Sequence, residues 1–274
     1  MKALISILLG ILQGITEFLP VSSSGHLAFF EKIFGHNMGM TAAELHLFNV
    51  MVHLATAIAV IIVFWKVIVN IFKSLFSKKE YENVKESNNL KLVVLIITAT
   101  IPTAAMGFFL RKYFVKMESN LLFIGIMFFA TALMLFLIKA FKKESITEYK
   151  RIGFLRAIFI GIMQGLAISP GLSRSGTTIA ACRYTGISRE KAGEFSFLIA
   201  IPAILGAAGL EITSSGISGT GAHVFILGFL SAFITGYFAL KVLLNFIKKG
   251  KLHYFGYYVI IMGIISIVLH WRGL

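Results

Sequence analysis

Residues 10–28 read GILQGITEFLPVSSSGHLA, and residues 161–179 read GIMQGLAISPGLSRSGTTI. The two stretches align without a gap at an offset of 151 positions (161 minus 10), and seven of the nineteen positions are identical. Apolar composition alone produces isoleucine matches, but it does not produce aligned Gln-Gly and Ser-x-Ser-Gly pairs. We infer an internal repeat, in which each copy carries a polar, serine-rich turn inside apolar sequence.

The composition is that of an integral membrane protein. The 274 residues are 57% hydrophobic and 14% charged, whereas soluble domains carry about 25% charged residues. Several apolar runs approach the roughly 20 residues that a spanning helix needs. The net charge of +14 reflects membrane topology rather than nucleic-acid binding, because the basic residues lie in loops between the apolar runs.

Loop charges predict the topology of the chain. Basic residues crowd into 73–91, 139–156 and 241–251, which the positive-inside rule assigns to the cytoplasm. The loop 211–221 has no basic residue and is expected outside. We therefore predict an all-α integral membrane protein with about six spanning helices. The predicted spans are 47–72, 91–110, 119–140, 192–210, 222–243 and 252–271.

The serine-rich stretches do not fit as spans. The loop charges make 1–46 begin and end outside and 153–191 begin and end inside, so each is predicted to be a re-entrant helix–loop–helix element. Non-helical backbone at membrane depth is tolerated where it is buried in protein or lines a wet cavity. Each repeat, 1–140 and 141–274, then holds one re-entrant element and three spans. An odd number of spans gives an inverted-topology repeat within a single membrane domain, with a site near the midplane.

Two ionisable residues of the first repeat, Glu17 and His26, are candidates for catalysis. Gln13 and Glu17 are four residues apart, so they project from one helix face. A carboxylate on a membrane helix is costly and by default functional, although an interfacial position for Glu17 is the alternative. His26 is a candidate acid, base or nucleophile towards phosphorus, with a structural role as the alternative. His46 and His53 are weaker candidates.

The serines and Arg174 predict an anion site where the two repeats meet. A serine after a helix break either caps the next helix or, with the helix N-terminus, binds phosphate. Arg174 occupies the position that matches Ser23, and its guanidinium suits phosphate oxygens. An ion pair with Glu17 is the alternative for Arg174. The residues predicted to bind a diphosphate are Ser22, Ser24, Ser173, Arg174, Ser175, Gly176 and Thr178.

Both motifs carry a family resemblance. QGITEFLPVSSSGH, residues 13–26, resembles the (E/Q)xxxE plus PVSSxGH signature of the undecaprenyl-diphosphatase family, the bacitracin-resistance proteins. PGLSRSGTT, residues 170–178, resembles that family's PGxSRSxxT signature. The resemblance covers the whole chain in length, spacing and hydropathy. It implies hydrolysis of undecaprenyl diphosphate to undecaprenyl phosphate and inorganic phosphate, at the outer face of the cell (cytoplasmic) membrane, to recycle the lipid carrier of cell-wall synthesis.

The resemblance also implies roles for individual residues. Gln13 and Glu17 are implied to hold a divalent cation, Mg²⁺ or Ca²⁺. The implied catalytic residues are Glu17, Ser23, His26 and Arg174.

The chain departs from the family pattern at three positions. Gln13 stands where members often have Glu, so a site with one carboxylate should bind a metal more weakly. Asn49 and His53 stand where relatives are associated with Glu and Gln, which puts the surroundings of the site in doubt.

Two other functions fit parts of the sequence. A transporter or flippase of a phosphorylated polyprenyl lipid would also use inverted repeats and anion-binding serines. A small-anion channel is the third alternative. Glu17 and His26 favour an enzyme, because Ile168 and Thr177 stand at the matching positions of the second repeat and catalysis needs one asymmetric set of groups. The expected partners are a polyprenyl diphosphate substrate and membrane lipids, without nucleic acid, and a homodimer is left open.

Overall fold

The structure is a computed structural model that describes residues 2–34, 40–77, 87–140, 146–212 and 221–273. The described residues form helices and carry no β-strand, apart from an isolated bridge between Ile146 and Ile187. The helices are α1 (Lys2–Phe18), α2 (Ser23–Phe34), α3 (Ala42–Val63), α4 (Trp65–Leu75), α6 (Asn88–Met117), α7 (Leu121–Ala140), η2 (Tyr149–Arg151), α8 (Phe154–Leu166), α9 (Arg174–Tyr184), α10 (Arg189–Ile212), α11 (Ala222–Lys248) and α12 (His253–Trp271).

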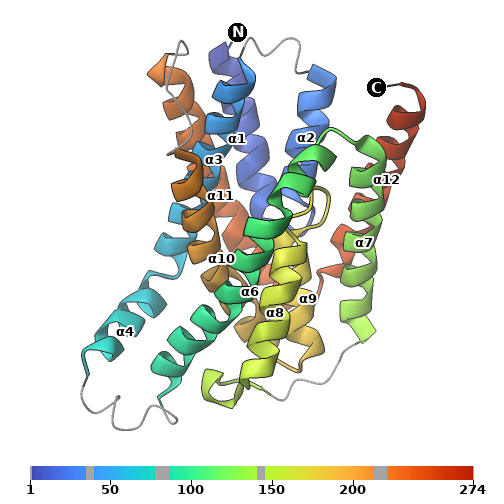
Figure 1. Cartoon of the computed structure of the whole chain (residues 1–274). Helices are drawn as coiled ribbons and strands as arrows, with labels where there is room; N and C mark the ends of the chain where they lie inside the picture. The colour runs from blue at the N-terminus through green and yellow to red at the C-terminus, as the bar shows by residue number, and fades with distance from the viewer. Residues whose placement is uncertain (1, 35–39, 78–86, 141–145, 213–220, 274) are drawn as a thin grey trace.

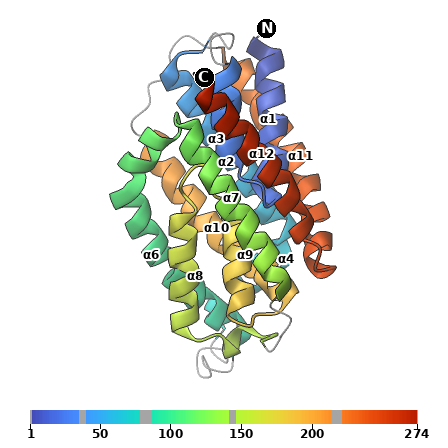
Figure 2. The same ribbon diagram turned by 90° about the vertical axis from the view of Figure 1, so that its right-hand side faces the viewer.

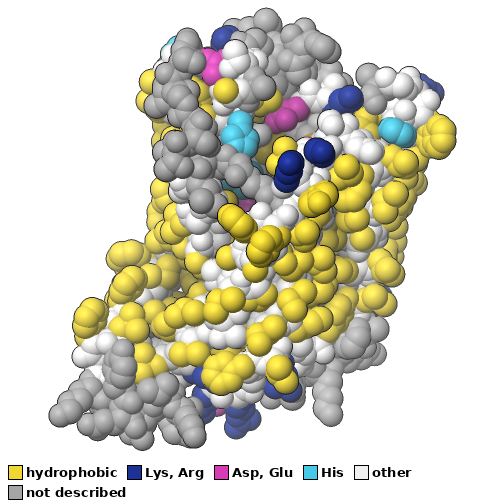
Figure 3. All heavy atoms as spheres, viewed as in Figure 1, with side chains coloured by type: hydrophobic (Ala, Val, Ile, Leu, Met, Phe, Trp, Pro, Cys, Tyr) yellow, Lys and Arg dark blue, Asp and Glu magenta, His cyan; other side chains and the backbone are white. Residues whose placement is uncertain are grey.

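Six helices of the described chain are long and apolar enough to cross a bilayer, as predicted. They are α3, α6, α7, α10, α11 and α12. Apolar side chains form a broad belt across the face shown in Figure 3, and charged side chains gather toward its two ends. The structure describes the basic segments 73–91 and 139–156 in part and 241–251 in full. Their described residues lie at the lower end of Figure 1, where α4 and α11 end and α6 and α8 begin. The chain is therefore a multi-pass membrane protein.

The prediction of one span over 47–72 is wrong. A capping box between Thr41 and Glu44 begins α3 earlier than predicted, and α3 ends at Val63. The separate helix α4 then runs away from the bundle (Figure 1). Lys66 and Lys73 are exposed on α4, whose apolar and polar residues separate onto different faces. Such a helix suits the membrane interface better than the hydrocarbon.

The two serine-rich stretches form helical hairpins that meet at mid-height. The α1–α2 hairpin occupies the upper half of the molecule and the α8–α9 hairpin the lower half (Figures 1 and 2). Their turns touch: a Cβ added to Gly25 would lie 2.9 Å from Gly171 Cα, and one added to Gly176 would lie 3.2 Å from Pro20 Cβ. This arrangement supports the internal repeat. Insertion from opposite faces of a bilayer stays a prediction, as do the repeat boundaries.

Each hairpin packs its first helix against a spanning helix of the other repeat. Helix α1 lies along α11, and α8 lies along α6. The matched glycines make these close contacts: Gly10 and Gly14 face α11 backbone, Gly161 faces α6 backbone, and Gly165 faces the Met106 side chain of α6. Glycine allows two helix backbones to approach closely, which is how membrane helices pack. The repeated Gln-Gly pairs therefore mark two close helix crossings.

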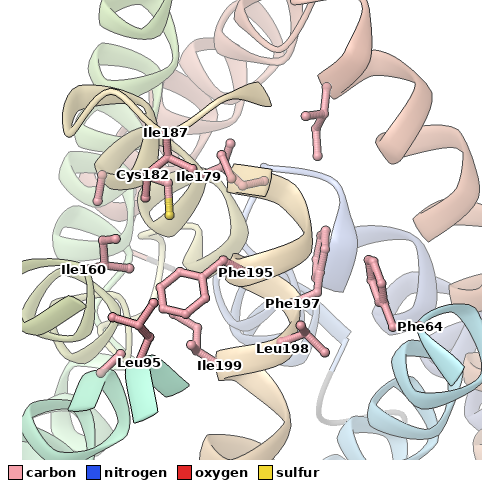
Figure 4. Packing of buried hydrophobic residues seen from close by; sticks show 14 of the residues in the cluster. Phe64, Leu95, Ile160, Ile179, Cys182, Ile187, Phe195, Phe197, Leu198 and Ile199 are labelled. Carbon is pink, nitrogen blue, oxygen red and sulfur yellow. The ribbon is translucent and has the colours of Figure 1, made fainter. Parts of the chain in front are cut away.

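The largest buried cluster lies around α9 and α10. Cys182 of α9 and Phe195 of α10 are fully buried in it, together with Ile160 of α8 (Figure 4). Phe197 joins the cluster and meets Phe18 of α1 edge-on, with ring centroids 5.7 Å apart. This packing holds α8 and α9, and with them the turn between these helices, in a fixed position.

Close contact between α1 and α11 predicts that Gly14→Ala is destabilising. A Cβ there would lie 2.6 Å from the Ala232 carbonyl oxygen and 2.7 Å from Gly236 N, and backbone atoms cannot rotate away. Overpacking of this kind costs about 1–3 kcal/mol, so the thermal midpoint of the detergent-solubilised protein should fall. Gly206→Ala is the matched control, because nothing lies within 4 Å of its added Cβ. Equal midpoints for the two variants would contradict the close crossing.

Candidate active site at the meeting of the two hairpins

The carboxylate of Glu17 is the centre of the site. Glu17 lies in the last turn of α1 and is only 7% exposed. Gln13 Nε2 donates to its Oε2 at 3.0 Å, and Ser23 Oγ donates to the same oxygen at 2.7 Å. Arg174 Nη2 forms an ion pair with Oε1. A buried carboxylate needs such partners, and here they come from both hairpins.

Serine caps begin both helices that follow the turns. Ser22 Oγ accepts a hydrogen bond from Gly25 N at 3.2 Å, and Ser173 Oγ accepts one from Gly176 N at 3.1 Å. The capping alternative for these two serines is therefore confirmed. Each cap holds the next residue in the first turn of its helix. That next residue is Ser23 in one copy and Arg174 in the other, and both contact Glu17.

Arg174 has unused binding capacity. Its side chain is 17% exposed, and its Cζ lies 5.8 Å from the centroid of the Phe197 ring. Nη2 is engaged by Glu17, but Nη1 is buried and has no hydrogen-bond partner among the residues that the structure describes. A buried charged donor without a partner is costly. An anionic ligand oxygen at Nη1 would remove that cost, and guanidinium groups bind phosphate well.

His53 of α3 completes the surroundings of Glu17. Its Nε2 lies 3.7 Å from Glu17 Oε2, and its Nδ1 hydrogen bonds with the Asn49 carbonyl oxygen at 2.7 Å. The sequence indicated His53 only as a weaker candidate. The structure brings it into the site, since α3 packs beside α1.

His26 does not pair with Glu17. Its Nδ1 lies 2.8 Å from the Ser22 carbonyl oxygen, and its Nε2 lies 2.8 Å from the Tyr258 hydroxyl of α12. We expected His26 to lie beside Glu17; the structure instead places His53 beside this carboxylate, and His26 faces α12.

Comparison with known proteins identifies the family. The family described as bacitracin resistance protein BacA matches residues 6–265. The chain belongs to this family. An undecaprenyl-diphosphatase of Carboxydothermus hydrogenoformans is 40% identical over 100% of the chain and 99% of its own length. Relatives of the same name in Methanosphaera stadtmanae (38% identical, 96% of each chain) and Treponema denticola (40% identical, 97% of each chain) are also similar.

Several residues predicted to bind the diphosphate also hold the turns of this BacA-family fold, and their binding role stays a prediction. Thr178 is fully buried, and its hydroxyl contacts Ser196 of α10 and the Arg174 carbonyl oxygen. Ser175 Oγ donates to the Leu19 carbonyl oxygen at 3.4 Å, which ties the two turns together. The remaining hydroxyl and amide contacts lie within the caps: Ser22 with Ser24, Ser173 with Ser175, and Gly176 with Ser173.

Thr131 and Tyr258 were missed by the sequence analysis. Thr131 of α7 accepts a hydrogen bond from Ser173 N at 2.9 Å and donates to the Gly171 carbonyl oxygen at 3.1 Å. It therefore fixes the second turn. A threonine in a spanning helix commonly bonds to its own backbone, so the sequence contains no signal for this role.

Gln13 and Glu17 are the residues that could hold a divalent cation. Within the described part of the chain, Gln13 Oε1 is buried without a hydrogen-bond partner, and an amide oxygen beside a carboxylate fits the oxygen preference of Mg²⁺ and Ca²⁺. The described residues contain no group of three or more His, Cys, Asp or Glu side chains suited to a metal. Oxygen atoms of a bound ligand would have to complete the coordination.

The buried ion pair predicts a non-additive effect on stability. Glu17→Gln leaves the Arg174 charge buried without its partner, which costs about 3–5 kcal/mol. The double variant Glu17→Gln with Arg174→Met removes that charge, so it should unfold at a higher temperature than Glu17→Gln alone. Thermal unfolding in detergent measures both. A double variant less stable than Glu17→Gln would show that the two residues act independently.

Proposed function

We propose that the chain is an undecaprenyl-diphosphatase. It hydrolyses undecaprenyl diphosphate to undecaprenyl phosphate and inorganic phosphate, and thereby recycles the lipid carrier for cell-wall synthesis. The supporting observation is the unpartnered Nη1 of Arg174, buried next to a carboxylate that also holds a serine hydroxyl. Membership in the BacA family and relatives named undecaprenyl-diphosphatase support the same substrate.

Arg174 binds the diphosphate. Nη1 donates to a phosphate oxygen while Nη2 stays on Glu17, so the guanidinium keeps a fixed orientation. Phosphoryl transfer spreads negative charge over the phosphate oxygens, and a fixed cation at that point lowers the barrier. The undecaprenyl chain remains among the apolar helices.

Glu17 accepts the proton from the attacking hydroxyl. Ser23 Oγ already donates to Glu17 Oε2, so either this hydroxyl or a water that replaces it attacks the terminal phosphorus. A bond forms between the attacking oxygen and phosphorus, and the bond to the bridging oxygen breaks. Undecaprenyl phosphate leaves with the bridging oxygen. Attack by Ser23 produces a phosphoserine, which a water then hydrolyses.

A divalent cation assists this chemistry. Gln13 and Glu17 would hold it, and when bound it would supply positive charge to neutralise the diphosphate. The enzyme acts in the cell membrane, with the site opening to the outer face, and a homodimer remains one form of assembly.

Phosphate release tests the proposed function. Purified enzyme with undecaprenyl diphosphate and Mg²⁺ should release inorganic phosphate. Arg174→Ala should lower kcat about 100-fold or more, the effect of losing one charge-stabilising donor. Arg156→Ala is the control, since Arg156 is exposed at the start of α8. Wild-type protein that moves the lipid between leaflets of a vesicle without releasing phosphate would favour the flippase.

The amide at position 13 predicts weak metal binding. Gln13→Glu adds a second carboxylate, so the Mg²⁺ concentration that gives half-maximal phosphate release should fall. Chelation with EDTA should abolish release by the wild-type enzyme. Full activity in EDTA would contradict the proposed cation.

A further inference from the structure

Both ring nitrogens of His26 are engaged. Nδ1 lies 2.8 Å from the Ser22 carbonyl oxygen, and Nε2 lies 2.8 Å from the Tyr258 hydroxyl. A carbonyl oxygen only accepts hydrogen bonds, so Nδ1 carries the proton. In the neutral ring Nε2 is then the acceptor, and the Tyr258 hydroxyl donates to it. Neither nitrogen is free to take a proton from a substrate.

Packing fixes the same ring. His26 is only 5% exposed. Tyr258 stacks on it with ring centroids 5.6 Å apart and an interplanar angle of 7°, and Phe128 of α7 meets it edge-on at 5.3 Å. Tyr258 belongs to α12, so the second repeat supports the imidazole of the first.

The Ser22 carbonyl belongs to a strained turn. Ser22 has φ 70°, which among the described residues other than glycine is the one positive value. This conformation is unfavourable for a residue with a Cβ. The matching residue Ser173 has φ −69°, and Thr177 stands at the position that matches His26. The imidazole of His26 therefore occurs in the repeat whose turn is strained at Ser22. The other repeat, whose turn at Ser173 is not strained, has Thr177 in place of the imidazole.

The strained turn controls where Ser23 points. Ser23 follows Ser22 directly, and its Oγ donates to Glu17 Oε2 at 2.7 Å. A change in the Ser22 backbone would swing Ser23 away from Glu17. We propose that Tyr258 and His26 are positioning residues: Tyr258 anchors the imidazole, the imidazole holds the Ser22 carbonyl, and the turn keeps Ser23 on Glu17. The kinetic part of this inference rests on the proposed function.

Tyr258→Phe tests the anchor, because it removes the hydroxyl and keeps the stacked ring. We expect kcat for phosphate release to fall about three- to tenfold, the size of one neutral hydrogen bond, with KM nearly unchanged. Tyr257→Phe is the matched control, since Tyr257 is exposed on the same helix. In a His26→Ala background Tyr258→Phe should cause no further loss. An equal loss in both backgrounds would overturn the proposal.

His26→Asn separates positioning from proton transfer. The asparagine amide can donate to the Ser22 carbonyl in place of Nδ1, but it carries no titratable proton. We expect His26→Asn to keep a higher kcat than His26→Ala, with the pH profile of the wild-type enzyme. Equal kcat values for the two variants, at equal thermal midpoints, would make His26 a proton carrier and overturn the positioning role.

An imidazole NMR spectrum tests the hydrogen bond without activity. In ¹⁵N-histidine-labelled protein, the signal missing from His26→Ala belongs to His26. Its Nε2 resonance should shift in Tyr258→Phe and stay in place in Tyr257→Phe. No shift in Tyr258→Phe would overturn the anchor. Wild-type protein that releases no phosphate but shows this shift would instead refute the proposed function alone.

Discussion

The ion pair between Glu17 and Arg174 is the contact on which the architecture depends. Glu17 is buried and the Arg174 side chain is only 17% exposed, and an unpaired charge in such a setting is very costly. The two residues are far apart in the chain and lie in different hairpins, so the pair forms only if both turns reach the same depth. Gly25 and Gly171 let the turns touch, and the glycines of α1 and α8 let these helices lie close to their spanning partners.

The two repeats share a frame but differ in chemistry. Both use a serine cap, and the residue after the cap contacts Glu17 in each case. The matched glutamines differ: Gln13 donates to Glu17, whereas Gln164 donates to Thr103 and to the Ile199 carbonyl oxygen. The two turns are thus built alike, and a few side chains that differ between them give their meeting point its asymmetry.

Local motifs pointed to residues that meet in the fold, although their catalytic roles stay predictions. Glu17, Ser23 and Arg174 were identified from short motifs, and the structure brings all three together. The continuous span 47–72 was wrong, because hydropathy alone does not reveal that the chain turns at Phe64 into the separate helix α4. Sequence reasoning also ranked His53 low, since a lone histidine on an apolar helix carries no information about which neighbour it will face.

The sequence by itself determined the membrane setting, the number of spans and the two polar turns, because apolar run length, loop charge and repeated motifs are properties of the chain. Only the tertiary structure decided which polar groups are left free. His26 and Tyr258 lie 232 residues apart, and their hydrogen bond exists because α12 packs beside the first hairpin. Hydrogen-bond partners depend on side-chain direction across packed helices. Among the described residues, that packing leaves Arg174 Nη1 without a hydrogen-bond partner, whereas both ring nitrogens of His26 have one.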